Sequence, residues 1–99
     1  DELGLKGKVF TAGTGMPAAN AQILKDGSVS TLTLWDPANA GYAMASLATK
    51  ILNGETIEDG VNLGVEGYES MHFSSGSTKV LEGTGWLKIT KDNVDSLGF

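Results

Sequence analysis

The chain has 99 residues, of which 40% are hydrophobic and 19% charged, values typical of a single globular unit. It contains seven basic residues, all of them lysines that are not clustered in the sequence, and twelve acidic residues. The resulting net charge of −5 disfavours nucleic acid and acidic ligands as partners. The absence of cysteine excludes disulfides, thiolate metal sites and thiol nucleophiles. No apolar run approaches the roughly 18 residues that a transmembrane helix needs. We predict no cofactor, no metal and no redox chemistry.

The first third of the chain predicts a strand, a glycine loop, a helix and a second strand. Residues 8–12 favour β-structure, and a glycine-rich loop follows at 13–15. Pro17 suits the first position of a helix, which is expected to end at 25–27. Alternating hydroxyl and apolar side chains over 30–35 indicate a half-buried strand.

The rest of the chain predicts one long helix and several short strands. Asp36 and Pro37 provide a cap and a first-turn proline for a helix over 38–53, whose apolar side chains recur every three or four residues. Asp92 could cap a final short turn. Short strands are predicted at 61–65, 68–73, 79–81 and 86–90.

One motif predicts an enzyme. The run Gly13-Thr14-Gly15-Met16-Pro17-Ala18 fits the G-x-G-x-x-G/A pattern of dinucleotide-binding loops. Half of a dinucleotide-binding domain of an oxidoreductase is therefore an alternative function. Pro17 weakens it by removing a helix N-terminal amide, and Asp36, at the end of the next strand, suits a helix cap better than a ribose contact. The ends of parallel strands remain a usual place for ligands.

Several segments together resemble a known family. They are the glycine turn with Pro17, the helix end Lys25-Asp26-Gly27-Ser28-Val29, the strand Thr31-Leu32-Thr33-Leu34-Trp35-Asp36-Pro37, Gly41-Tyr42 and the helix end Ile51-Leu52-Asn53-Gly54-Glu55. Their order resembles the carboxyl-terminal part of periplasmic-binding-protein-like (type I) sugar receptors, the solute-binding subunits of bacterial ABC importers. The run Leu34-Trp35-Asp36 and the tail 90–99 are most similar to the rhamnose-binding and autoinducer-2-binding branch.

This resemblance implies an α/β fold, the C-terminal portion of a two-lobed receptor with a three-layer α/β/α arrangement and a mainly parallel sheet. Residues 1–35 and 63–99 would belong to the C-terminal lobe, and 36–62 would carry a helix across to the N-terminal lobe. Because family members are longer, the chain is expected to be a fragment that does not bind its ligand by itself. We expect no enzyme activity and a periplasmic or extracellular location, with a lipoprotein anchor in a Gram-positive cell.

The implied partners are a monosaccharide or autoinducer-2-like ligand and the permease of the transporter. The helix over 38–53 would lack its sheet, so a helix-exchanged homodimer or a missing N-terminal segment is expected to cover Met44, Leu47 and Ile51; otherwise these side chains are exposed. The predicted ligand-binding residues are Gly15, Met16, Pro17, Trp35 and Asp36.

Two of these residues have simpler interpretations. Trp35 could lay its ring on the apolar face of a sugar, or it could be a core residue. Asp36 could accept hydrogen bonds from hydroxyl groups, or it could cap the helix. His72, the only histidine, has no second ligand at a suitable spacing and is interpreted as structural.

Overall fold

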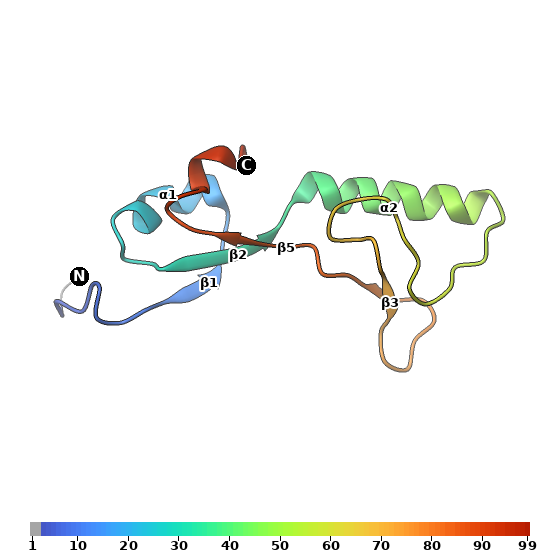
Figure 1. Ribbon diagram of the computed structural model, residues 1–99, viewed down its shortest axis with the longest axis horizontal. Coiled ribbons are helices and arrows are strands. Elements are labelled where there is room, and N and C mark those ends of the chain that lie inside the picture. The colour runs from blue at the N-terminus through green and yellow to red at the C-terminus, as the bar shows by residue number, and fades with distance from the viewer. Residues whose placement is uncertain (1–2) are drawn as a thin grey trace. The chain divides into compact units, whose positions relative to one another are not determined.

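The computed structural model describes residues 3–99 and is a mixed α/β structure (Figure 1). It divides into two compact units. Unit 1 contains the residues up to Leu34 together with Leu87–Phe99, and unit 2 is Trp35–Trp86. In order, the elements are β1 (Ala12–Thr14), α1 (Pro17–Lys25), β2 (Thr31–Trp35), α2 (Pro37–Leu52), β3 (His72–Phe73), β4 (Leu81–Glu82), β5 (Trp86–Ile89) and a 3₁₀ turn (Val94–Ser96). None of the helices within residues 3–99 is long and apolar enough to cross a membrane.

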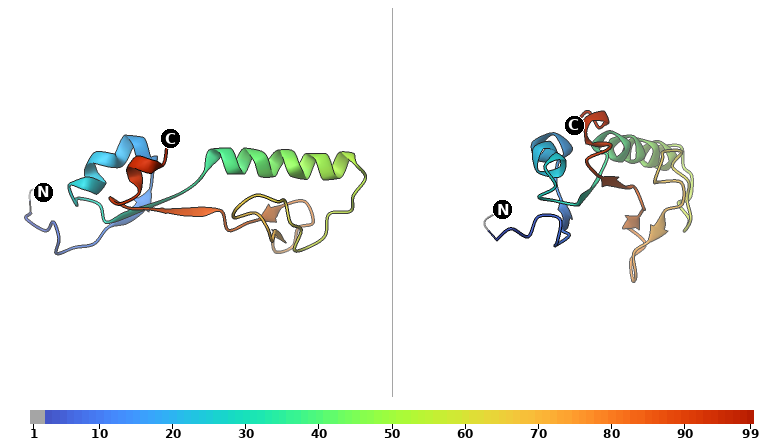
Figure 2. Two further views of the ribbon diagram at one scale, coloured as in Figure 1. Left: turned by 45° about the horizontal axis from the view of Figure 1, so that its top comes forward. Right: turned by 60° about the vertical axis from the view of Figure 1, so that its left-hand side comes forward.

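In unit 1, a three-stranded sheet is ordered β1-β2-β5, and β1 pairs in parallel with β2 from Ala12↔Thr31 to Thr14↔Thr33. The helix α1 and the 3₁₀ turn lie side by side over this sheet (Figure 2). The buried side chains that hold these elements together are Leu24, Leu32, Leu34, Ile89 and Val94. Alternation along β2 buries its two leucines while its two threonines stay half-exposed, as the sequence pattern predicted.

In unit 2, α2 begins at its cap Asp36, as predicted, and ends at Leu52. Its buried residue Ala43 packs with Leu63 and Met71 from the loops that follow. A two-stranded antiparallel sheet of β3 and β4 pairs His72 with Glu82. The strand pairing of residues 3–99 is thus mixed, whereas a mainly parallel sheet was expected.

The first predicted strand is displaced toward its glycine loop. Residues 8–12 were expected, but β1 is Ala12–Thr14. At Thr11 the backbone amide bonds the hydroxyl of Ser30 instead of a backbone carbonyl, at 3.1 Å. The regular parallel ladder therefore begins one residue later, at Ala12.

The predicted strand over 61–65 is wrong. Only an isolated bridge between Val61 and Met71 forms there. The side chain of Asn62 accepts a hydrogen bond from the backbone amide of Gly64 at 2.7 Å, and Gly64 has a φ of 70°. A side chain that closes a local turn, followed by a left-handed glycine, ends a strand. The strand expected over 68–73 is confined to His72–Phe73, since Tyr68 is part of a turn in which its amide bonds the carbonyl of Val65 at 2.9 Å.

The boundaries of the two units lie between Leu34 and Trp35 and between Trp86 and Leu87. Residues 63–86 belong to unit 2 because Leu63 and Met71 are buried against α2. The assignment of either unit to a receptor lobe stays a prediction.

Candidate functional site

The most distinctive surface feature of unit 2 is a pair of indole rings. Trp35 and Trp86 meet edge to face, with ring centroids 5.6 Å apart and ring planes at 81°. Both side chains are largely accessible, with exposed fractions of 45% and 58%. An edge-to-face pair is a favoured aromatic geometry, so each ring holds the other in place while leaving indole surface open to a ligand.

The positions of both rings follow from strand alternation. Trp35 is the last residue of β2 and directly follows the buried Leu34, so it points to the opposite face. Trp86 is the first residue of β5, a strand in which Ile89 is buried and Lys88 exposed. The amide of Trp86 also donates a hydrogen bond to the carbonyl of Thr84 at 2.7 Å, which fixes the backbone at the start of the strand.

Asp36 adjoins Trp35 and caps α2. Its Oδ1 atom accepts hydrogen bonds from the amides of Ala38 at 2.8 Å and Asn39 at 3.4 Å. Both bonds use the same oxygen, so Oδ2 remains able to accept a hydrogen bond from another donor. The capping interpretation is confirmed.

Gly15 and Met16 lie in unit 1 between β1 and α1, and Pro17 is the first residue of α1. The carbonyl of Met16 accepts two hydrogen bonds from Asn20, one from the side-chain Nδ2 at 2.8 Å and one from the backbone amide at 3.2 Å. Pro17 is fully buried as the first residue of α1, while Met16 is exposed. A ligand at this loop would therefore meet the side chain of Met16 and not that of Pro17.

The start of α1 offers little to a dinucleotide. Pro17 has no amide hydrogen, and the amide of Ala18 already donates to the carbonyl of Phe99 at 3.1 Å. Two of the donors that would bind a pyrophosphate are thus lost or occupied. Asp36, the candidate for a ribose contact, caps α2.

The predicted site residues therefore fall into two groups, Gly15-Met16-Pro17 in unit 1 and Trp35-Asp36 in unit 2. Trp86 joins the second group, although its sequence context predicts only a strand. The pairing of two tryptophans far apart in the sequence has no local signal; two exposed tryptophans at strand ends would have been the only hint. Within residues 3–99, no group of three or more His, Asp or Glu side chains is placed to hold a metal ion.

Neither the protein-family models nor the curated proteins contain a match to this chain.

Proposed function

We propose that this chain is the carboxyl-terminal portion of a type I solute-binding subunit of a bacterial ABC sugar importer. Its ligand would be a monosaccharide or an autoinducer-2-like molecule. The observation that carries the proposal is the accessible Trp35–Trp86 pair, with Asp36 next to Trp35 in the sequence. The resemblance of the sequence to the rhamnose-binding and autoinducer-2-binding branch supplies the receptor class.

The chemistry of this site suits a small polyol. The C–H groups on one face of a sugar pack well on an indole ring, because the ring is flat, apolar and carries negative charge on its face. A neighbouring carboxylate oxygen accepts hydrogen bonds from hydroxyl groups more strongly than a neutral acceptor does. Trp35 and Trp86 would provide the apolar contact, and Oδ2 of Asp36 would orient the ligand.

The arrangement of the elements is compatible with this receptor class. The parallel pairing of β1 with β2, which α1 connects, supports it. In the cell, the protein would deliver its ligand to a membrane permease from the periplasm, or from the outer surface as an anchored lipoprotein.

The exposed face of α2 also supports a larger receptor. Met44 and Ile51 are 73% and 57% exposed, while Leu47 is partly buried against the core of unit 2. The sixteen residues of α2 include one charged side chain, Lys50. The exposed face of α2 is mostly apolar, and an apolar helix face is typically covered by another element. We assign this face to contact with the upstream part of the same receptor.

Ligand titration of the receptor that contains this chain tests the proposal. The two tryptophans of the chain are Trp35 and Trp86, so its intrinsic fluorescence reports on the proposed site. We expect rhamnose or a related monosaccharide to change the emission of a receptor in which any other tryptophan is replaced by phenylalanine. Calorimetry should give the same affinity. Saturable binding of NAD with no response to sugars would support the dinucleotide-binding alternative instead.

A further inference from the structure

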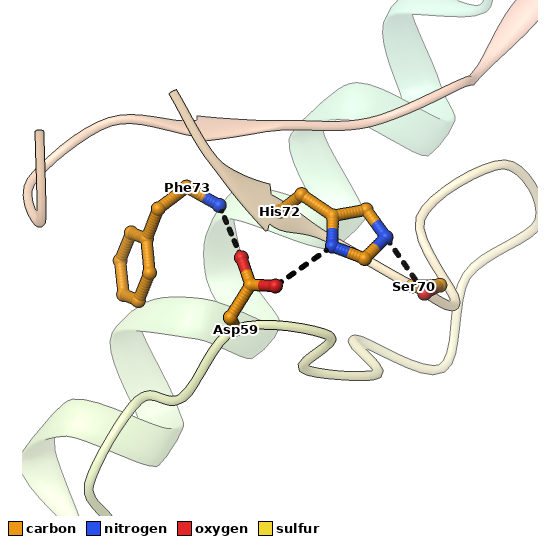
Figure 3. Close-up of polar contacts among 4 residues, drawn as sticks. All are labelled: Asp59, Ser70, His72 and Phe73. Carbon is orange, nitrogen blue, oxygen red and sulfur yellow. Dashed lines mark hydrogen bonds and ion pairs between the residues drawn. The ribbon is translucent and has the colours of Figure 1, made fainter. Parts of the chain in front are cut away.

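Unit 2 contains a second polar constellation, unrelated to the indole pair. It consists of Asp59, His72 and Ser70, which Figure 3 shows in a row, with the imidazole ring between the carboxylate and the hydroxyl group. Nδ1 of His72 lies 3.0 Å from Oδ2 of Asp59, and Nε2 lies 3.3 Å from Oγ of Ser70. We propose that these three side chains form a serine–histidine–aspartate triad that makes Ser70 an acceptor for acyl groups from small activated esters.

The protonation pattern of the ring follows from its neighbours. The hydrogen-bonded neighbours of Asp59, namely the imidazole of His72 and then the amide of Phe73, lower the pKa of this carboxyl group. Asp59 is therefore ionised near neutral pH and can only accept hydrogen bonds. Nδ1 must carry the ring hydrogen, so in the neutral ring Nε2 has a free lone pair directed at the hydroxyl of Ser70. This is the tautomer that a general base requires.

The carboxylate is itself held in place. Oδ1 of Asp59 accepts a hydrogen bond from the backbone amide of Phe73 at 2.7 Å, while Oδ2 faces the imidazole. The side chain of Asp59 is thus hydrogen-bonded both to the backbone of β3, at Phe73, and to a side chain of β3, the imidazole ring of His72. Asp59 acts as a positioning residue that limits the rotation of the His72 ring.

The spacing of the other two residues has a backbone origin. Ser70 and His72 are separated by one residue, Met71, which is buried and donates its amide to the carbonyl of Val61 at 2.9 Å. In extended chain, residues two apart point to the same side. With Met71 directed into the core, the hydroxyl and the imidazole both lie on the solvent side.

The reaction proceeds in two balanced halves. Oγ of Ser70 bonds to the ester carbonyl carbon as its proton moves to Nε2 of His72, and the breaking C–O bond leaves its electron pair on the alcohol oxygen, which takes that proton. Water then attacks the acyl group, gives a proton to Nε2, and the bond from carbon to Oγ breaks as Ser70 regains the proton. The net change is hydrolysis of an ester to an acid and an alcohol. All three side chains are exposed, so small esters can reach them.

The test uses p-nitrophenyl acetate and mass mapping of the acetylated chain. We expect an acetyl group on Ser70 and not on Ser75, an exposed serine of the same unit. Ser70→Ala should abolish this adduct. Asp59→Asn and His72→Gln should slow its formation roughly 100-fold, the lower end of what a positioned base contributes. Ser75→Ala should change nothing.

Folding of each variant is checked by circular dichroism, and Asp59→Asn is the critical one. An asparagine at position 59 can still accept the hydrogen bond of the Phe73 amide through its side-chain oxygen. It then presents an NH₂ group to the imidazole ring of His72, or a neutral acceptor if the side-chain amide is reversed. A folded Asp59→Asn chain with an unchanged acetylation rate would overturn the proposal. So would ester cleavage that persists in Ser70→Ala and is lost in His72→Gln, because the imidazole would then be the nucleophile.

Discussion

Gly15 packs so closely against Asn20 that a side chain at position 15 would displace it. A Cβ atom built on Gly15 would lie 2.9 Å from Nδ2 of Asn20, the atom that donates to the carbonyl of Met16. The close approach of a side chain thus favours glycine here, since Gly15 has no positive φ.

Gly15→Ala is therefore expected to disturb the start of α1. Asn20 must move, and the hydrogen bond to Met16 is weakened or lost, which should cost about 1 kcal/mol of unfolding free energy. Gly13→Ala is the matched control, because its Cβ would meet only the Leu32 side chain, at an ordinary 3.7 Å. Urea unfolding of both variants makes the comparison, and equal midpoints would show that Asn20 adapts without cost.

The two tryptophans should contribute to ligand binding more than to stability. In the full receptor, Trp35→Ala and Trp86→Ala should each lower sugar affinity by roughly 1–3 kcal/mol, because each removes an accessible aromatic surface. Replacement by phenylalanine should recover part of the loss. Calorimetry measures the affinity. If Trp35→Ala instead unfolds the protein while its folded fraction binds normally, the ring belongs to the core.

Substitutions of Asp36 can separate its two roles. Asp36→Ala should lower the unfolding free energy by about 1 kcal/mol, because the first amides of α2 lose their cap. Asp36→Asn should keep the stability, since asparagine is an equally good cap, but it should weaken binding of a hydroxylated ligand that needs a carboxylate. Thermal unfolding and ligand titration of both variants test this. Unchanged affinity in Asp36→Asn would restrict the residue to capping.

The pKa of Asp59 predicts a stability change in acid. Its pKa is lowered from 3.8 mainly by the hydrogen bond with His72 and then by the Phe73 amide, so the folded state favours the ionised form. The unfolded chain binds the proton more readily, and this stabilising contribution is present above pH 3.8 and lost as the pH falls through the lower folded value. Asp59→Asn should flatten that part of the stability profile. Glu58→Gln controls for the loss of one negative charge, and equal profiles of the two variants would contradict the assignment.

The exposed face of α2 should make the 99-residue chain associate with itself when the rest of a receptor is not supplied. We expect sedimentation velocity to show association that increases with concentration, driven by burial of Met44 and Ile51. Met44→Lys and Ile51→Lys should reduce it, whereas Thr49→Lys, also on the exposed surface, should have less effect. A chain that stays monomeric at high concentration would argue against an apolar contact surface on α2.

The two helices were predictable because their signals are local. Pro17 and Asp36 mark the helix starts, and both lie where the sequence placed them. The strands after α2 could not be predicted in the same way, because their pairing depends on residues distant in the sequence and on turns such as the one closed by Asn62. For the same reason, the sequence did not predict the contact of Trp86 with Trp35 or the contacts of His72 with Asp59 and Ser70. These residues come together only when the loops of unit 2 fold against Ala43 and its neighbours.

The Trp35–Trp86 contact also determines how the chain could be divided. These residues are the first and last of unit 2, and the strands that carry them, β2 and β5, are neighbours in one sheet. Adjacent strands lie about 4.8 Å apart, so unit 2 leaves unit 1 and returns to it at nearly the same point. It is an insertion whose ends meet. A short hairpin turn could replace it without stretching β2 or β5, and a short linker between its own ends would close it into a ring.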